Sequence, residues 1–189
     1  MYALMALFAA VIVFLDQASK TWVVNNIFSS HCYAGGDPSV CAGHIDTLKD
    51  VFGVTDQQMS AMPSQADGVD GVFHLSHVHN TGAAWSSFQG MHWLFALVFV
   101  VFTVAVVWEF SKKRWGFTTF ERWCIVAVWA GGLGNMIDRL RLSYVVDMIA
   151  VDFMEFPVFN VADCFISCGC IALIGHLILF NKGFWKDKK

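Results

Sequence analysis

Two aspartates, Asp147 and Asp163, are the strongest candidates for acid–base chemistry in this sequence. Asp147 follows the strand-like segment YVV, Asp163 begins an apolar run, and only 15 residues, with a turn at Pro157, separate them. This spacing allows the two carboxylates to be brought face to face. In a partly dehydrated site they cannot both ionise cheaply, so one keeps a proton and the pair can activate water against a peptide carbonyl. The simpler alternatives are a helix cap for Asp163 and a solvated loop acid for Asp147.

Further polar residues lie at the ends of the apolar runs. In the segment DQASK, Asp16 and Lys20 are four residues apart and share one face of a helix. Ionisable groups within a membrane span are costly and mark functional sites. Three asparagines offer amides that can orient a carboxylate or hold an extended peptide, although capping and turn formation are their simpler roles. They are Asn80 in NTGAAW, Asn135 in GGLGNMIDR and Asn160 in FNVAD.

The residues around Asn135 have mainly structural interpretations. The glycines Gly131, Gly132 and Gly134 would let one helix pack closely against another. Asp138 and Arg139 are interpreted as an ion pair or a lipid headgroup contact rather than as catalytic groups.

Other catalytic chemistries find little support. The sequence has no G-x-S-x-G or H-E-x-x-H motif, and Ser19 directly precedes Lys20, which is the wrong spacing for a helical Ser-x-x-Lys pair. His74, His77 and His79 are interpreted as solvated loop residues rather than metal ligands, since His74 and His77 would fall on opposite faces of a strand. We therefore expect neither a metal nor a cofactor.

The six cysteines do not form the framework of a disulfide-rich domain. Cys164 and Cys168 would share a helix face, and we interpret them as small buried residues rather than as redox or metal groups. Cys32 and Cys41 lie in a polar loop and could pair in an oxidising compartment. The sequence leaves that pairing open.

The composition indicates a small polytopic membrane protein. Hydrophobic residues make up 57% of the chain and charged residues only 14%. The net charge of −3, without a basic patch, argues against nucleic-acid binding. Four apolar runs are predicted to span the membrane as helices, at about residues 1–24, 91–108, 123–137 and 164–180, within a single membrane-embedded domain of residues 1–189.

Loop charges predict the orientation of these spans. The segments EFSKKRWGFTTFER and NKGFWKDKK are rich in lysine and arginine, which places them and both termini in the cytoplasm. The outer loop, about residues 25–90, contains one lysine and six aspartates. With this topology the polar residues named above gather at the outer ends of the spans, whereas the inner ends carry charges expected to be solvated.

The outer segments are expected to include short strands. VFHLSHVH and SYVVDMIAV are rich in β-branched residues, so a small extracytoplasmic sheet resting on the helices is predicted. The predicted fold is therefore an all-α integral membrane protein of four transmembrane helices, with a small β-cradle and a long outer loop.

The segments DQASK, NTGAAWS, GGLGNMIDR, VVDMI and FPVFNVAD occur in this order, and with them the sequence resembles the bacterial lipoprotein signal peptidases. The resemblance implies an aspartic endopeptidase of the bacterial inner membrane with its active site at the periplasmic face. Its substrates would be prolipoproteins carrying a diacylglyceryl cysteine, cut just before that residue. The resemblance also implies contact with membrane lipids and inhibition by globomycin, and we expect a monomer.

By motif, the resemblance assigns the catalytic pair to Asp147 and Asp163. It assigns supporting or substrate-binding roles to a polar shell of seven residues: Asp16, Lys20, Asn80, Gly82, Asn135, Arg139 and Asn160. Two departures from the family pattern are Trp85, where phenylalanine is expected, and a longer segment between His31 and Gly71. A small transporter and a non-catalytic lipoprotein-binding protein are the alternative functions.

Overall fold

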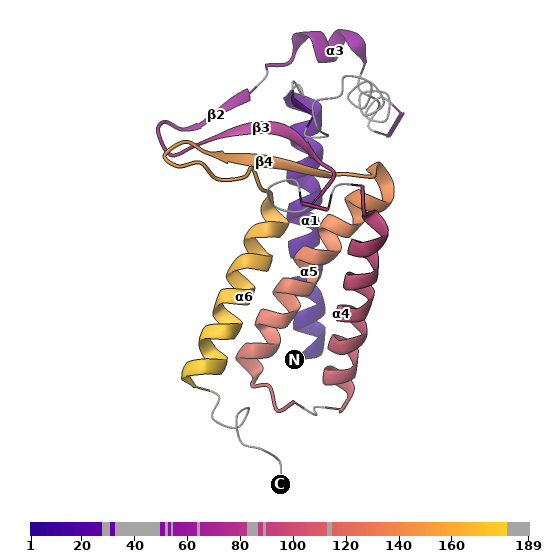
Figure 1. Ribbon diagram of the computed structural model, residues 1–189, viewed down its shortest axis with the longest axis vertical. Helices are drawn as coiled ribbons and strands as arrows, with labels where there is room; N and C mark the ends of the chain where they lie inside the picture. Colours follow the sequence, from indigo (N-terminus) through magenta and orange to yellow (C-terminus); the bar gives the residue numbers. More distant parts are fainter. Residues whose placement is uncertain are drawn as a thin grey trace.

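The protein is a helical bundle capped by a small sheet. The structure is a computed structural model that describes residues 1–27, 31–32, 50–51, 53, 55–63, 65–82, 87–88, 90–112 and 115–180. Its long helices are α1 (Tyr2–Asn26), α4 (His92–Lys112), α5 (Thr119–Leu142) and α6 (Val161–Leu179). The sheet lies across one end of the bundle, and the first residues of α1 and the last residues of α6 lie at the other end (Figure 1).

Three of these helices, α1, α4 and α6, are long and apolar enough to cross a membrane. Most of their large apolar side chains are exposed, as expected where lipid is the solvent. Helix α5 packs against all three and contacts α6 most extensively. It is less apolar because its ends carry five charged residues. The chain is thus a multi-pass membrane protein.

The helix bounds follow the predicted spans, with one clear difference. The predicted spans 1–24, 91–108 and 164–180 agree with α1, α4 and α6 within a few residues. Helix α5 extends beyond the predicted 123–137 at both ends. Its start is fixed by a capping box between Thr118 and Glu121, and it ends before Ser143, which adopts a left-handed conformation with φ of 63°.

Three charged residues at the end of the bundle away from the sheet are buried. The prediction that the charges there are solvated was wrong for these three. Glu109, Glu121 and Arg122 are at most 8% exposed. Arg122 pairs with Glu109 at 3.3 Å, and a carboxylate oxygen of Glu121 lies 2.9 Å from Nδ1 of His176. The side chains at this end therefore link α4, α5 and α6 through polar contacts that satisfy the buried charges.

Strand β3 (Phe73–Asn80) organises the sheet. It pairs antiparallel with β4 (Val145–Val151) along its length and with β2 (Gln65–Val69) over its first half, and parallel with the two-residue β1 (His31–Cys32) near its end. Because β4 covers one edge of β3 throughout, β1 and β2 share the other edge. The predicted strands in VFHLSHVH and SYVVDMIAV are confirmed, and a short helix, α3 (Asp56–Ala61), precedes β2.

Buried histidines fasten β3 to the end of α1. Nδ1 of His77 lies 2.9 Å from the carbonyl oxygen of Ile27, which can only accept, so Nδ1 carries the proton. Nε2 of His77 then accepts from Nε2 of His79 at 3.1 Å. Burial lowers the pKa of His77 to about 4. The prediction that these histidines are solvated loop residues was wrong for both, because the sheet packs onto the helices and covers them.

Two apolar clusters hold these parts together. One joins α1, the α5–β4 connection and the inner face of the sheet, and the other fills the α1–α5 contact. The first cluster contains Val23, Val24, Ile27, Leu142, Tyr144, Val146 and Met148. It anchors β4, and with it Asp147, to the top of the bundle.

Candidate active site

Asp147 lies in the middle of β4 and is only 2% exposed. Its Oδ2 accepts a hydrogen bond from the amide of Asn80 at 2.8 Å, and its Oδ1 accepts one from Asn160 at 2.7 Å. Burial, and next the negative charge of Asp163, raise the pKa of Asp147 to about 7. The prediction of a solvated loop acid does not apply, since β4 turns this side chain inward. Near neutral pH, Asp147 can hold a proton or release it.

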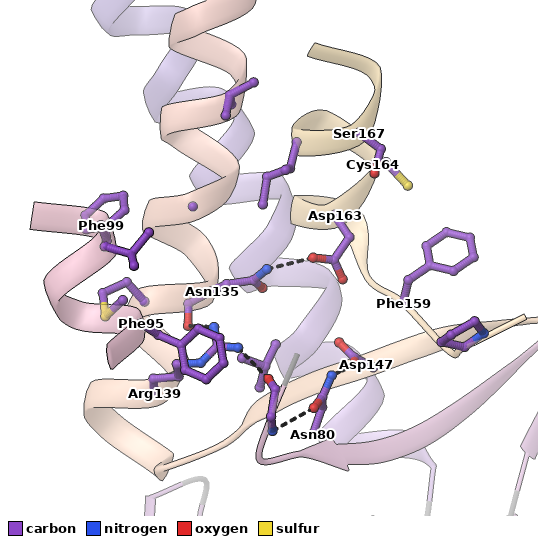
Figure 2. Close-up of a pocket in the computed structure, with 18 of the residues that line it drawn as sticks. Asn80, Phe95, Phe99, Asn135, Arg139, Asp147, Phe159, Asp163, Cys164 and Ser167 are labelled. Carbon is purple, nitrogen blue, oxygen red and sulfur yellow. Dashed lines mark hydrogen bonds between the residues drawn. The ribbon is translucent and has the colours of Figure 1, made fainter. Parts of the chain in front are cut away.

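Asp163 is the third residue of α6 and takes part in a capping box with Asn160. Its Oδ2 accepts from the backbone N–H of Asn160 at 3.2 Å, and the Asn160 side chain accepts from the backbone N–H of Asp163 at 3.0 Å. The other carboxylate oxygen, Oδ1, accepts from the Asn135 amide at 2.8 Å. The capping role foreseen for Asp163 is thus real, and it leaves the carboxylate facing the cavity (Figure 2).

The asparagine amides around the two carboxylates have fixed orientations. The side-chain oxygen of Asn80 accepts from the backbone N–H of Gly82 at 2.9 Å. That of Asn135 accepts from Nζ of Lys20 at 2.9 Å and from the Asn160 amide at 3.1 Å. Because each oxygen is engaged by a donor, the NH2 groups must face the carboxylates. Both aspartates therefore receive only donors from their neighbours.

Helix α1 supplies a buried ion cluster beneath this site. Nζ of Lys20 lies 2.9 Å from Asp16 and 3.0 Å from Asp138. Asp16 also accepts from the backbone N–H of Ala162 at 2.9 Å, which ties α1 to the first turn of α6. Gln17 donates to Asp16, to Asp138 and to the carbonyl oxygen of Gly134. The sequence interpretation missed Gln17, although a polar residue beside Asp16 in an apolar run was the available signal.

Arg139 does not form the predicted ion pair with its neighbour Asp138. Asp138 is turned toward Lys20, whereas Arg139 donates to the carbonyl oxygen of Gly82 at 2.8 Å. The Arg139 guanidinium also lies over the ring of Phe95, 4.3 Å from its centroid. Consecutive helical residues point about 100° apart, which explains why these two side chains serve different partners. Arg139 thereby holds the chain just after β3 against α5.

One cavity of about 640 Å³ connects these groups. Its polar end is formed by Asn80, Gly82, Asn135, Arg139, Asp147 and Asp163. The remaining wall is apolar and comes mainly from α4, α5 and α6, with residues such as Phe99, Phe102, Val128 and Ile166. Figure 2 shows Asp147 entering from β4 and Asp163 from α6. Six of the predicted site residues line the cavity, and Asn160 and Lys20 each contact Asn135 in its wall. Asp16 lies farther from the cavity and accepts from the backbone N–H of Ala162.

Metal and thiol chemistry are not indicated in the described part of the chain. Its His, Cys, Asp and Glu side chains form no group of three or more arranged to hold a metal ion. His74 lies 2.6 Å from Asp152 near the other end of β3, away from His77 and His79. Trp85 and the Cys32–Cys41 pairing fall outside the side chains that the structure describes.

Comparison with known proteins identifies the family of this chain. A family model described as signal peptidase (SPase) II matches residues 8–179. The chain belongs to the signal peptidase II family. As a member of this family, the protein is a protease. The predicted resemblance to the lipoprotein signal peptidases is confirmed.

Individual relatives agree with this assignment. The lipoprotein signal peptidase of Enterococcus faecalis is 40% identical over 124 residues, which cover 64% of this chain and 74% of the relative. That of Streptococcus agalactiae is 31% identical over 174 residues, covering 92% and 86%. Two solved structures, each described as a bacterial membrane enzyme, are 24% identical with TM-scores of 0.70 and 0.68. They cover 99% and 94% of this chain, and 94% of their own length in each case, which shows a shared fold.

Proposed function

We propose that this protein is an aspartic endopeptidase that removes the signal peptide from diacylglyceryl-modified prolipoproteins, cutting just before the lipidated cysteine. The observation that carries the proposal is the convergence of Asp147 and Asp163 on one cavity that is polar at one end and apolar along its length. The family assignment supplies the reaction class, and the names of its relatives suggest the substrate.

The two aspartates would take different roles in this mechanism. Asp163, in the first turn of α6, accepts hydrogen bonds from the Asn135 amide and from the backbone N–H of Asn160, and we assign it the role of general base. Asp147, whose pKa is raised to about 7 by burial and by the charge of Asp163, keeps its proton and acts as general acid. Both oxygens of Asp147 already accept from asparagine amides, so its proton must point away from them.

Peptide hydrolysis would then proceed in two proton-balanced steps. Asp163 takes a proton from water as the water oxygen bonds to the scissile carbonyl carbon, and Asp147 gives its proton to the carbonyl oxygen. The resulting gem-diol collapses as the C–N bond breaks. Asp147 recovers a proton from a gem-diol hydroxyl, and Asp163 gives its proton to the leaving amine. The dyad is restored, and neither a metal nor a cofactor takes part.

The shape of the cavity suits such a substrate. Its apolar wall lies along helices that face lipid, so an apolar signal peptide and acyl chains can reach it from the membrane, while the scissile bond meets the polar end. Asn80, Gly82 and Arg139 lie at that end and can bind the peptide backbone. We further propose that α1, α4, α5 and α6 all cross the inner membrane, with both termini cytoplasmic and the site at the periplasmic face.

Single Asp147→Asn and Asp163→Asn variants test this function. Each should reduce kcat for cleavage of a lipidated prolipoprotein in vesicles by about 10²–10⁴-fold, the range for loss of a general acid or base. Asp152→Asn is the matched control, because this residue lies at the far end of the sheet and pairs with His74 outside the cavity. It should retain full activity, and globomycin should block this variant and the parent protein alike.

Three outcomes would contradict the proposal. Full cleavage by either dyad variant would remove that residue from the mechanism. Loss of activity in EDTA with recovery in zinc would point to metal chemistry instead. Retained substrate binding by the parent protein with no cleavage under any condition would favour the non-catalytic alternative.

A further inference from the structure

Lys20 occupies a position that the proposed chemistry does not itself use. Its ammonium group is 2% exposed, does not line the cavity and contacts neither Asp147 nor Asp163 directly. It has three partners: the carboxylates of Asp16 and Asp138, and the side-chain oxygen of Asn135 at 2.9 Å. These three partners satisfy the three donors of the buried ammonium group.

The contact with Lys20, together with the Asn160 amide that donates to the same oxygen at 3.1 Å, decides which way the Asn135 amide points. An asparagine side chain can rotate by about 180° and exchange its oxygen for its NH2 group at little steric cost. An ammonium group donates only, so Lys20 allows the oxygen and rejects the NH2 group. The NH2 group is then directed to Oδ1 of Asp163, which it reaches at 2.8 Å. In the rotated state an amide oxygen would face the Asp163 carboxylate and repel it.

We propose that Lys20 is a positioning residue that holds Asn135 as a donor to Asp163 and so fixes the direction of the hydrogen bond that the proposed general base accepts. This inference rests on the proposed function, in which Asp163 is the general base. The ion cluster around Lys20 strengthens the effect, because Asp16 and Asp138 fix the ammonium group from two sides. Gln17 also donates a hydrogen bond to each of these two carboxylates and so helps to hold them in place.

The pH dependence of the activity should report this role. The titratable and charged groups around Asp163 come from four elements: Asp16 and Lys20 of α1, Asp138 and Arg139 of α5, Asp147 of β4 and Cys164 of α6. Of these, Lys20 donates to the side-chain oxygen of Asn135, whereas Arg139 reaches only the backbone oxygen of that residue in the described contacts. Removal of Lys20 should therefore move the acidic limb of the kcat/KM profile upward, because the Asn135 amide would lose a contact that fixes it as a donor to the Asp163 carboxylate.

The test compares Lys20→Met with Asp138→Asn in the full-length protein. Lys20→Met should raise the pH of half-maximal kcat/KM on the acidic side by roughly one unit, since a nearby charge or hydrogen bond shifts a carboxyl by that amount or more. At pH values below the acidic limb, kcat/KM should then be about tenfold lower than that of the parent protein at the same pH. Asp138→Asn disturbs the same cluster but removes a negative charge and leaves the Lys20–Asn135 contact, so its acidic limb should stay in place or move down.

Two further variants keep the test decisive if Lys20→Met folds poorly. Lys20→Met with Asp138→Asn removes one charge of each sign and should show the same upward shift. In a protein that already carries Asn135→Ala, Lys20→Met should add little further shift, because Lys20 is proposed to act on Asp163 through Asn135. An acidic limb that stays in place in the folded Lys20 variants, while Asp163→Asn remains inactive, would overturn this inference but not the proposed function. An active Asp163→Asn protein would overturn the proposed function itself.

Discussion

At the residue scale, Asp147 shows how burial can make one carboxyl both useful and costly. Its pKa rises from 3.8 to about 7 because the sheet and helices exclude water and because Asp163 lies nearby. An acid with a higher pKa when folded binds its proton more tightly in the folded state. Its contribution to stability is complete at pH values below 3.8 and is lost as the pH rises toward about 7.

This linkage predicts the pH dependence of stability. Between pH 5 and pH 8 the parent protein should lose stability relative to Asp147→Asn. The loss should be about 1.4 kcal/mol for each pH unit over which Asp147 is protonated in the folded state and ionised in the unfolded state. The melting temperature of the variant minus that of the parent should therefore increase by several degrees across this range. Thermal unfolding in detergent would measure it. His77, whose pKa is lowered, acts with the opposite sign in both proteins and cancels in the difference. Parallel melting curves would show that Asp147 stays ionised when folded.

At the scale of the elements, the close approach of α5 to α6 depends on Gly131. A Cβ atom at this position would lie 2.5 Å from the carbonyl oxygen of Ala162 and 2.8 Å from the side chain of Ile166. The first contact is with backbone and cannot be relieved by rotation of a side chain. Since Ala162 directly precedes Asp163, any displacement there would also move the proposed general base.

Gly131→Ala is therefore expected to lower both stability and activity. Overpacking of this kind costs about 1–3 kcal/mol, and cleavage should fall because the first turn of α6 is pushed away from Asn135. Gly175→Ala is the matched control, because a Cβ atom there meets nothing within 4 Å. Thermal unfolding and the cleavage assay, applied to both variants, would measure the difference. Equal behaviour of the two would show that α6 can shift without harm.

At the scale of the whole molecule, the sheet and the candidate site share one end of the bundle. The start of α1 and the end of α6 lie at the other end (Figure 1). The polar groups at the end with the sheet line the cavity. Those at the opposite end pair with one another, Glu109 with Arg122 and Glu121 with His176. This arrangement suits an enzyme that meets its substrate at one face of a membrane.

The proposed orientation can be tested by cysteine labelling. In a protein without its native cysteines, Asp70→Cys in the β2–β3 turn should react with a membrane-impermeant maleimide in intact spheroplasts. Lys112→Cys at the end of α4 should react only after the membrane is permeabilised. Both positions are exposed, so access to the reagent depends on sidedness alone. The reverse pattern would invert the topology and place the cavity in the cytoplasm.

The sequence by itself determined the class of protein and the long helices, and it predicted as a pair two aspartates that the structure brings to one cavity. Apolar runs near the length of a bilayer core leave few alternatives to helices, and β-branched segments between them predicted β3 and β4. Helix ends were less well predicted, because capping boxes such as Thr118 with Glu121 extend α5 beyond its apolar part. Hydropathy does not record such local hydrogen bonds.

Only the tertiary structure decided which polar group serves which partner. Asp138 and Arg139 are adjacent in sequence, yet one binds Lys20 from α1 and the other binds Gly82 after β3. His77 and His79 become buried only because the sheet packs on α1 and α5. Sequence spacing limits which groups can meet, but burial and hydrogen-bond direction depend on contacts between distant segments. Those contacts set the orientation of three asparagines, the raised pKa of Asp147 and the link from Lys20 to Asp163.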